Sequence, residues 1–195
     1  MDNMDEIKAY AKANYIPIVR DQTAKKLTEL CHSLSPNKIL EIGTAIGYSG
    51  ILMLKSCNAK LHTIEKDEER AEKAEENFQK YAVSDRVTFY LDDAQKVIEE
   101  LCSKNEKFDL IFLDGAKGQY IKYYPYLKCL LNGGGILFTD NIYLHGFVQA
   151  DGKVPHKHRS MVVNLRKFID TLSHDSDLET TFYDIDDGYS ISKLK

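Results

Sequence analysis

The sequence predicts an α/β fold, a doubly wound, mostly parallel seven-stranded sheet of the Rossmann-like type with a C-terminal antiparallel hairpin. Two observations support this prediction. From about residue 38 to residue 141, short β-rich runs alternate with longer amphipathic runs, which is the pattern of strand–helix–strand units. Near the C-terminus, two further β-rich runs flank Asp186-Asp187-Gly188, a strong signal for a hairpin turn.

Seven segments are predicted as strands. The first five are separated by helical segments and are expected to pair in parallel, because such crossover connections bring strands together in the same direction. The last two are expected to pair with each other as an antiparallel edge. In chain order the predicted strands are 38–42, 60–65, 87–91, 108–114, 135–140, 178–185 and 189–194.

Three amphipathic segments are predicted as helices, namely 21–34, the residues around 71–81, and 156–174. In each of them apolar residues recur every three or four positions, so one face is expected to pack on the sheet. The inward positions are Ala24, Leu27 and Leu30 in the first, Ala71, Ala74, Phe78 and Tyr81 in the second, and Met161, Leu165, Phe168, Ile169 and Leu172 in the third.

Length and composition indicate one globular domain that spans residues 1–195. Hydrophobic residues make up 43% and charged residues 29%, a balance that excludes disorder and collagen-like repeats. The 26 basic and 30 acidic residues give a net charge of −4. This sum argues against a broadly basic nucleic-acid coat protein, but it does not exclude a local basic patch.

The cysteines lie too far apart in the sequence for a zinc knuckle or a CxxC dithiol. Cys31, Cys57, Cys102 and Cys129 are therefore expected to be free thiols that pack as small apolar residues in a reducing compartment. The charged N-terminus has no apolar signal region, and no apolar run approaches the roughly 18 residues of a membrane span. We therefore expect a cytoplasmic protein without a membrane partner.

A glycine-containing turn, EIGTAIGYS, follows the first predicted strand. Gly43 and Gly47 allow a tight turn and a close approach of the backbone to a ligand at the start of a helix. The spacing is not GxGxxG, because Tyr48 takes the place of the third glycine, and this disfavours a nicotinamide-dependent dehydrogenase. A purely structural turn is the alternative interpretation.

Acidic residues follow the second and third predicted strands. Glu65 ends the second strand, where a carboxylate can accept two hydrogen bonds from a ribose diol. Together with Gly43 it indicates a nucleoside-containing cofactor, although a surface glutamate is the alternative. Asp92-Asp93-Ala94, after the third strand, either caps a helix or lines an adenine pocket.

The fourth and fifth predicted strands also end in polar residues. Asp114 ends the fourth and Asp140-Asn141 ends the fifth, so two carboxylates and an amide are expected at one rim of the sheet. Repulsion between like charges favours a bound cation, and oxygen ligands suit Mg²⁺ rather than zinc. Lys117 is a candidate general base, since an ammonium beside a cation loses its proton more readily. An ordinary loop lysine is the alternative.

Taken together, these residues resemble the class I S-adenosylmethionine-dependent methyltransferases, and within them the metal-dependent O-methyltransferases typified by catechol and caffeoyl-CoA O-methyltransferases. EIGTAIGYS and TIEKD match the two cofactor motifs, and LDGAK and TDN match the two motifs that carry metal ligands and base. The resemblance implies a metal held by Asp114, Asp140 and Asn141, with Lys117 as the catalytic base. It implies S-adenosylmethionine contacts from Val19, Gly43, Ser49, Glu65, Asp93, Ala94 and Asp114, with Glu65 on the ribose.

A closer resemblance is to the bacterial tRNA 5-hydroxyuridine methyltransferases, carried by YIPIV, KILEIGTAIGYS, DGAKGQY, TDNIYLHGFV and DGYSISKLK. It implies O-methylation of 5-hydroxyuridine at the tRNA wobble position, with Mg²⁺ or a similar cation, and relatives suggest a homodimer. Two departures stand out. The chain begins without the helical stretch that relatives carry before AYAKANYIPIV, and Asp92 stands where relatives usually have glycine.

A basic cluster between residues 153 and 167 favours an RNA substrate, because phosphates need such a patch. A solvated helix start is the alternative. An O-methyltransferase of catechol-like small molecules and a non-catalytic cofactor- or RNA-binding module also remain open, although the intact metal and base residues argue against the latter. The candidate RNA contacts are Lys157, Arg159, Arg166, Lys167 and His145, with His156, His158 and Tyr143 beside them.

Overall fold

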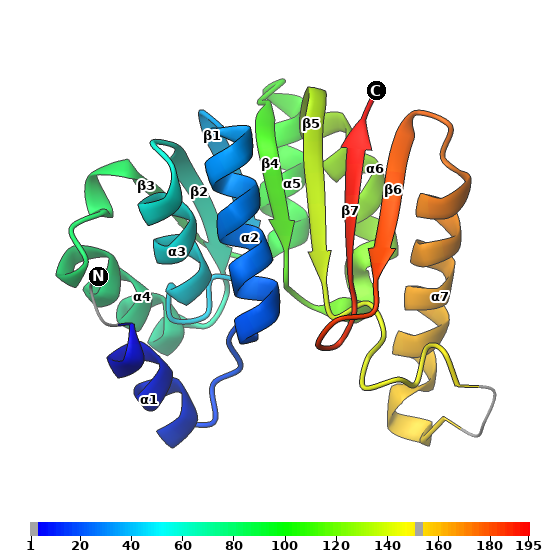
Figure 1. Ribbon diagram of the computed structural model, residues 1–195, viewed down its shortest axis with the longest axis horizontal. Helices are drawn as coiled ribbons and strands as arrows, with labels where there is room; N and C mark the ends of the chain where they lie inside the picture. The colour runs from blue at the N-terminus through cyan, green and yellow to red at the C-terminus, as the bar shows by residue number, and fades with distance from the viewer. Residues whose placement is uncertain (1–3, 151–153) are drawn as a thin grey trace. The chain divides into compact units, whose positions relative to one another are not determined.

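The computed structural model of the protein describes residues 4–150 and 154–195 (Figure 1). All seven predicted strands are present, in the sheet order β3-β2-β1-β4-β5-β7-β6. The sheet is parallel except at β7 and β6, so the predicted Rossmann-like α/β class is confirmed. The chain divides into two compact units, Met1–Val97 and Ile98–Lys195, which are described in turn.

The first unit contains three parallel strands of this sheet, with β2 in the middle. Ile64 of β2 lies opposite Ile42 of β1 and Tyr90 of β3. In Figure 1, α2 and α3 lie on the viewer's side of β1 and β2. The strands are β1 (Lys38–Ile42), β2 (Lys60–Glu65) and β3 (Val87–Leu91), as predicted. The helices are α1 (Asp5–Ala13), α2 (Asp21–Leu34), α3 (Tyr48–Ser56), α4 (Glu68–Lys80) and the 3₁₀ turn η1 (Ser84–Arg86).

The predicted apolar face of α4 is confirmed, because Ala71, Ala74, Phe78 and Tyr81 are all buried. Phe78 packs tightly on the glycine turn, and a Cβ atom added to Gly47 would lie 3.2 Å from its ring. The neighbouring residue, Asn77, donates a hydrogen bond of 2.8 Å from its side-chain amide to the carbonyl of Ile46. The helix therefore holds the glycine turn in place.

The second unit contains the other four strands, which pair in a mixed parallel and antiparallel arrangement. β5 pairs in parallel with β4 and antiparallel with β7, which in turn pairs antiparallel with β6. The strands are β4 (Phe108–Leu113), β5 (Leu131–Asp140), β6 (Leu178–Tyr183) and β7 (Tyr189–Leu194). The other elements are η2 (Lys117–Gln119), α6 (Tyr120–Leu130), η3 (His156–His158) and α7 (Arg159–His174), while α5 (Ala94–Ser103) runs from the first unit into the second.

Strand boundaries differ from the prediction at three places. β5 begins four residues early, at Leu131, which lies opposite Phe108 of β4. Residues 132–135 then form an irregularity in the pairing, which resumes with Ile136 opposite Leu110. β4 ends at Leu113, which leaves Asp114 in the following loop, and β6 ends at Tyr183. The predicted hairpin between β6 and β7 is confirmed, with Asp186 and Gly188 both at positive φ.

The long helix α7 packs on α6 and β6. Of the residues predicted to face inward, Leu165, Phe168 and Leu172 are buried. Met161 and Ile169 are only half-buried, and Val162 is buried instead. The innermost stripe of this helix thus runs through positions 162, 165, 168 and 172, and Met161 and Ile169 flank it.

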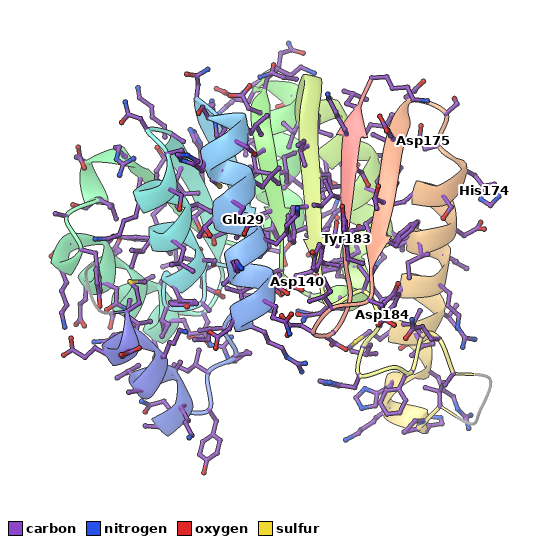
Figure 2. All side chains as sticks on the ribbon, in the orientation of Figure 1. Glu29, Asp140, His174, Asp175, Tyr183 and Asp184 are labelled. Carbon is purple, nitrogen blue, oxygen red and sulfur yellow. A yellow bond between two sulfur atoms is a disulfide. The ribbon has the colours of Figure 1, made fainter. Side chains whose placement is uncertain are left out.

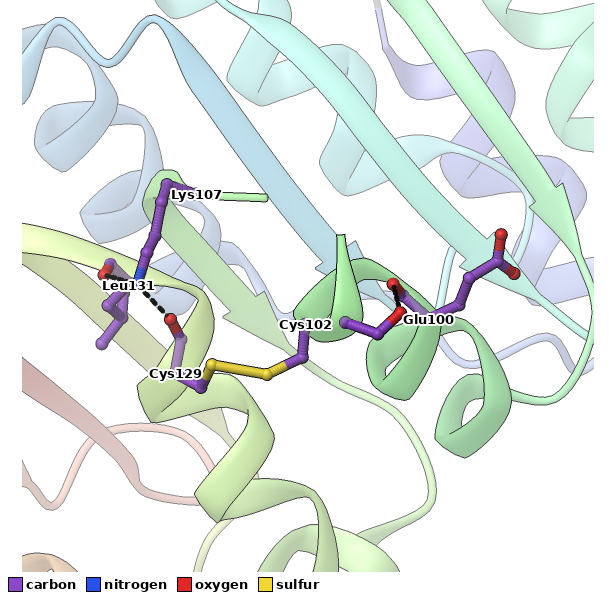
Figure 3. The surroundings of a disulfide bond; sticks show 6 residues. Glu100, Cys102, Lys107, Cys129 and Leu131 are labelled. Carbon is purple, nitrogen blue, oxygen red and sulfur yellow. Dashed lines mark hydrogen bonds between the residues drawn. A yellow bond between two sulfur atoms is a disulfide. The ribbon is translucent and has the colours of Figure 1, made fainter. Parts of the chain in front are cut away.

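The prediction of four free thiols is wrong for two cysteines. Cys102 near the end of α5 and Cys129 near the end of α6 form a disulfide, with Cα atoms 6.4 Å apart (Figure 3). No sequence motif marks this pair, because the two residues are 27 positions apart and only the packing of α5 and α6 brings them within reach. Cys31 and Cys57 are free, as predicted.

No helix in the described part of the chain is long and apolar enough to cross a membrane.

Candidate active site

The turn after β1 has an unusual backbone. Gly43, Ala45 and Gly47 all have positive φ, at +102°, +47° and +82°. The N–H groups of Gly43 and Thr44 both donate to the carbonyl of Ile64, at 3.0 and 3.2 Å, which fastens the turn to β2. Glycine tolerates positive φ at little cost. The turn therefore leads from β1 into α3 through a conformation that the two glycines permit.

Glu65, at the end of β2, anchors the same turn. Its Oε2 accepts a hydrogen bond of 2.9 Å from the N–H of Ala45, and its Oε1 accepts from the N–H groups of Lys66 (2.9 Å) and Asp67 (3.1 Å). Because an ionised carboxylate offers about four lone-pair positions and these bonds use three, one position remains for a ribose hydroxyl. Glu65 thus has a structural role that is compatible with its predicted role in cofactor binding.

Glu41 is a residue of this site that the sequence reasoning missed. It is fully buried in β1 and accepts hydrogen bonds from the hydroxyls of Ser49 (2.5 Å) and Thr63 (2.6 Å). Ser49, a predicted cofactor contact, therefore donates its hydroxyl hydrogen bond to Glu41. A charged residue within the apolar run KILEI was the available signal, since a buried carboxylate requires polar partners.

The other predicted cofactor residues lie on either side of this turn in the sequence. Val19 is buried in the segment between α1 and α2. Asp93 accepts a hydrogen bond of 2.9 Å from the N–H of Gln95, and Ala94 begins α5, so the helix-capping interpretation is confirmed. Asp92 accepts from the N–H of Asp93, and this bond together with Lys96 lowers the pKa of Asp92. The adenine contact stays a prediction.

The second unit carries the predicted metal ligands. Asp140 is the last residue of β5, where Figure 2 labels it, and it is only 1% exposed. Burial raises its pKa to about 7, and the negative charge of Asp114 adds to the shift. Burial also raises the pKa of Asp114, against the opposing effect of Lys117. The two carboxylates thus lie close enough to repel each other within the protein.

Asn141 and Lys117 complete the predicted set. Asn141 adopts a φ of +53°, and its N–H donates a hydrogen bond of 2.7 Å to Oδ1 of Asp140. Lys117 begins η2, and its Nζ forms an ion pair of 2.7 Å with Oδ1 of Asp114. The ammonium therefore occupies the side of Asp114 that a bound cation would compete for.

The donor set fits a hard divalent cation. Two mutually repelling carboxylates, one of them followed in the chain by the amide of Asn141, offer the oxygen ligands that Mg²⁺ prefers, and water or substrate can supply the rest. Across residues 4–150 and 154–195, no three His, Cys, Asp or Glu side chains gather as a metal site. A cation here would thus depend on Asp114 and Asp140 together with Asn141.

The predicted RNA contacts on η3 and α7 are exposed, but one of them, Arg166, is held by hydrogen bonds within the protein. Lys157, Arg159, Arg166 and Lys167 are all exposed. Arg166 donates hydrogen bonds from Nε to the carbonyl of Val148 (2.9 Å) and from Nη2 to the carbonyl of Ala150 (2.8 Å), so it fastens the loop after β5 to α7. Lys153, at the start of the basic cluster, lies outside the described residues.

The loop after β5 is also held at its first half. The N–H of His145 donates to Asp187 in the hairpin turn, and the His145 side chain is 65% exposed. Tyr143 packs on Gly188 so closely that a Cβ atom there would lie 2.1 Å from the ring. Between this loop and α7 lies a groove of about 690 Å³, lined among others by Tyr143, Val148, Arg166 and Ile169.

Known proteins are similar to this chain in sequence and in fold. The O-methyltransferase family matches residues 1–195. A caffeoyl-CoA O-methyltransferase of Populus kitakamiensis is 28% identical over 192 residues, which cover 95% of this chain and 81% of the relative. A catechol O-methyltransferase of Niastella koreensis is 30% identical over 131 residues, or 66% of this chain and 55% of the relative.

Solved structures agree with this assignment. A Staphylococcus aureus protein assigned to the caffeoyl-CoA O-methyltransferases has a TM-score of 0.92 and 30% identity, covering 100% of this chain and 93% of that one. An O-methyltransferase from Bacillus cereus in complex with SAH shares the fold, with a TM-score of 0.88 and 24% identity over 98% of this chain and 90% of that one. The chain therefore belongs to the O-methyltransferase family, as an S-adenosylmethionine-dependent enzyme of the caffeoyl-CoA and catechol type.

Proposed function

We propose that the protein methylates a hydroxyl that lies beside a second oxygen, with a divalent cation held by Asp114, Asp140 and Asn141. The observation that supports this most strongly is the placement of two carboxylates at the ends of β4 and β5, where burial, and then the charge of Asp114, raises the pKa of Asp140 to about 7. Such a pair destabilises the fold unless an opposite charge offsets it. Transfer of a methyl group from a sulfonium needs no metal, so a metal site indicates a substrate that chelates.

The residues of the second unit then have distinct roles. Lys117 takes the proton of the substrate hydroxyl after its ion pair with Asp114 has parted. The oxyanion attacks the methyl carbon of S-adenosylmethionine in line, the new O–C bond forms as the C–S bond breaks, and S-adenosylhomocysteine leaves uncharged. When bound, Mg²⁺ supplies chelation of both substrate oxygens and lowers the pKa of the hydroxyl. The protein also aligns the substrate oxygen with the methyl carbon and the sulfur of S-adenosylmethionine.

The substrate that we propose is 5-hydroxyuridine at the wobble position of tRNA, with 5-methoxyuridine as the product. Its hydroxyl lies beside a ring carbonyl, so it offers the required pair of oxygens. The exposed cations Lys157, Arg159 and Lys167 support an RNA substrate, because they lie on η3 and the first turns of α7 with no acidic residue between positions 153 and 167.

A catechol-like small molecule is the second candidate. It also presents two adjacent oxygens, and the relatives named above act on caffeoyl-CoA and catechol. A small phenol has no need of the exposed cations on η3 and α7. This difference separates the two candidates experimentally.

Substrate choice is tested with labelled S-adenosylmethionine and Mg²⁺, using tRNA from a strain that lacks 5-methoxyuridine and, separately, a panel of catechols. We expect label in the tRNA. Label in catechols with none in tRNA would assign the second candidate instead.

The basic patch is tested by the double variant Lys157→Ala/Arg159→Ala. We expect weaker tRNA binding and a salt dependence of the affinity that is lower by about one unit of slope per lost phosphate contact. The affinity for S-adenosylmethionine should stay unchanged, and Lys193→Ala, at an exposed position of β7, serves as the matched control. Equal losses of tRNA and S-adenosylmethionine affinity would indicate misfolding and contradict the phosphate role.

A further inference from the structure

A buried tyrosine joins the ends of the two strands that precede the predicted metal ligands. Tyr120, the first residue of α6, is 0% exposed. Its hydroxyl lies 3.4 Å from the carbonyl oxygen of Leu113 and 3.4 Å from that of Asp140. Leu113 directly precedes Asp114, so one hydroxyl contacts the backbone of Asp140 and the backbone of the residue before Asp114.

The surroundings of Tyr120 hold this hydroxyl in place. The N–H of Gly115 also contacts the hydroxyl. The Tyr120 ring packs edge-on against Phe168 of α7, with centroids 5.6 Å apart. The hydroxyl therefore lies between two backbone carbonyls, to either of which it can donate.

The position of Tyr120 in the sequence is also significant. It follows Lys117 by three residues, through η2 into α6, so one turn of chain supplies both the proposed base and the hydroxyl that spans the strand ends. Any shift of this turn would change the position of Lys117 and the separation of the two strand ends together.

We infer that Tyr120 is a positioning residue, whose hydroxyl sets the spacing between the ends of β4 and β5 and thereby the spacing of Asp114 and Asp140. This inference rests on the proposed cation site. A chelating site tolerates ligand displacements of only about 0.5 Å. The Tyr120 hydroxyl, which contacts the backbone beside both ligands, therefore affects cation affinity without touching substrate. Tyr120 has no place in the proton transfer itself.

The chain offers a matched control in Tyr124, one turn further along α6. It is buried, and its ring also packs edge-on against Phe168, with centroids 6.1 Å apart. Its hydroxyl, however, donates to Asp175 after the end of α7, away from the ends of β4 and β5. Tyr124→Phe thus removes a comparable hydrogen bond of a buried hydroxyl and leaves the contacts of the Tyr120 hydroxyl unchanged.

The experiment measures Mn²⁺ binding to the metal-free full-length protein by electron paramagnetic resonance, for wild type, Tyr120→Phe, Tyr124→Phe and Asp140→Ala. Melting temperatures and S-adenosylmethionine affinities are recorded in parallel. We expect Tyr120→Phe to weaken Mn²⁺ binding about tenfold or more, as losses in the outer shell of metal sites commonly do. Tyr124→Phe should keep wild-type affinity, although both variants melt earlier.

The outcomes separate this inference from the proposed function. Loss of Mn²⁺ binding in Asp140→Ala, with unchanged affinity in Tyr120→Phe, would overturn the positioning role and leave the cation site standing. Equal weakening in both Phe variants would reduce Tyr120 to a general packing role and likewise overturn it. Full Mn²⁺ affinity in Asp140→Ala would overturn the cation site, and the inference with it.

Discussion

Of the two acidic residues proposed to hold a cation, Asp140 is the more deeply buried. It is 1% exposed, whereas the Asp114 side chain is 18% exposed and forms an ion pair with the ammonium of Lys117. A fold that needed only stability would replace such a group with apolar residues. The residues at this site are therefore better explained by binding than by folding.

Asp140→Asn is expected to stabilise the metal-free protein. Since the pKa of Asp140 is about 7 in the folded protein and about 3.9 when unfolded, the native state holds a proton that the unfolded chain has lost between these values. Wild-type stability thus falls as the pH rises through this window, whereas the amide has no such loss. The gain should grow from near zero at pH 4 to at most about 4 kcal/mol at pH 8, measured by denaturant unfolding.

The exposed Asp170→Asn on α7, which breaks only a surface pair with His174, should show no such gain. A loss of stability in Asp140→Asn at pH 8 would contradict the claim that its charge is uncompensated.

Asp175 is the opposite case, a carboxylate that stabilises the fold. It lies at the other end of the second unit from Asp140 (Figure 2) and accepts hydrogen bonds from Tyr124 and, at 2.7 and 2.8 Å, from Lys128. Hydrogen bonds from Lys128 and then Tyr124 lower its pKa to about 2. A carboxyl with a lowered pKa stabilises the fold above its unfolded pKa, and this contribution is lost as the pH falls toward 2.

Asp175→Asn should therefore lower the free energy of unfolding by about 2 kcal/mol at pH 7, with the difference from wild type shrinking between pH 4 and pH 2. Asp177→Asn is the control, because Asp177 bonds the same Lys128 at 2.8 Å but is 66% exposed, so its loss should stay below about 1 kcal/mol. Equal losses in both variants, independent of pH, would contradict this explanation.

At the scale of single residues, the sequence predicted those whose role depends on their place along the chain. Asp114, Asp140 and Glu65 follow apolar runs, and the carboxyl ends of parallel strands are where ligands bind. Glu41 and Tyr120 act through partners that are distant in sequence or on other elements, such as Ser49 and the carbonyl of Asp140. Periodicity carries no information about such partners.

At the scale of elements, the strands were predicted well because each has an apolar run bounded by turn residues. β5 shows the limit, since Leu131–Gly135 joins the strand despite three glycines that predict a turn, with Leu131 opposite Phe108 of β4. The disulfide shows a second limit, because it depends on how α5 and α6 pack and not on any local pattern.

The disulfide between α5 and α6 should stabilise the second unit. It closes a loop of 27 residues, for which the loss of chain entropy in the unfolded state is worth about 3 kcal/mol. Dithiothreitol should lower the melting temperature of wild type to that of Cys129→Ser and leave the variant unchanged. Four reactive thiols in the denatured, unreduced protein would contradict the presence of the bond.

At the scale of the whole molecule, the net charge of −4 obscures a local distribution. Asp114 and Asp140 are acids that a cation is proposed to offset, while Lys157, Arg159 and Lys167 expose positive charge on one short stretch of η3 and α7. A summed charge therefore excludes a broadly basic surface but not an enzyme with one basic patch. The enzyme class follows from the whole chain, since the family match covers residues 1–195.

The central claim is that methyl transfer requires a hydroxyl with a neighbouring oxygen and a cation held by the second unit. The most direct measurement compares labelled methyl transfer to one tRNA carrying either 5-hydroxyuridine or uridine at the wobble position, with Mg²⁺ or with EDTA. We predict label only in the 5-hydroxyuridine tRNA with Mg²⁺, located by mass spectrometry at the wobble nucleoside. Equal labelling in EDTA, or equal labelling of the uridine tRNA, would contradict the central claim.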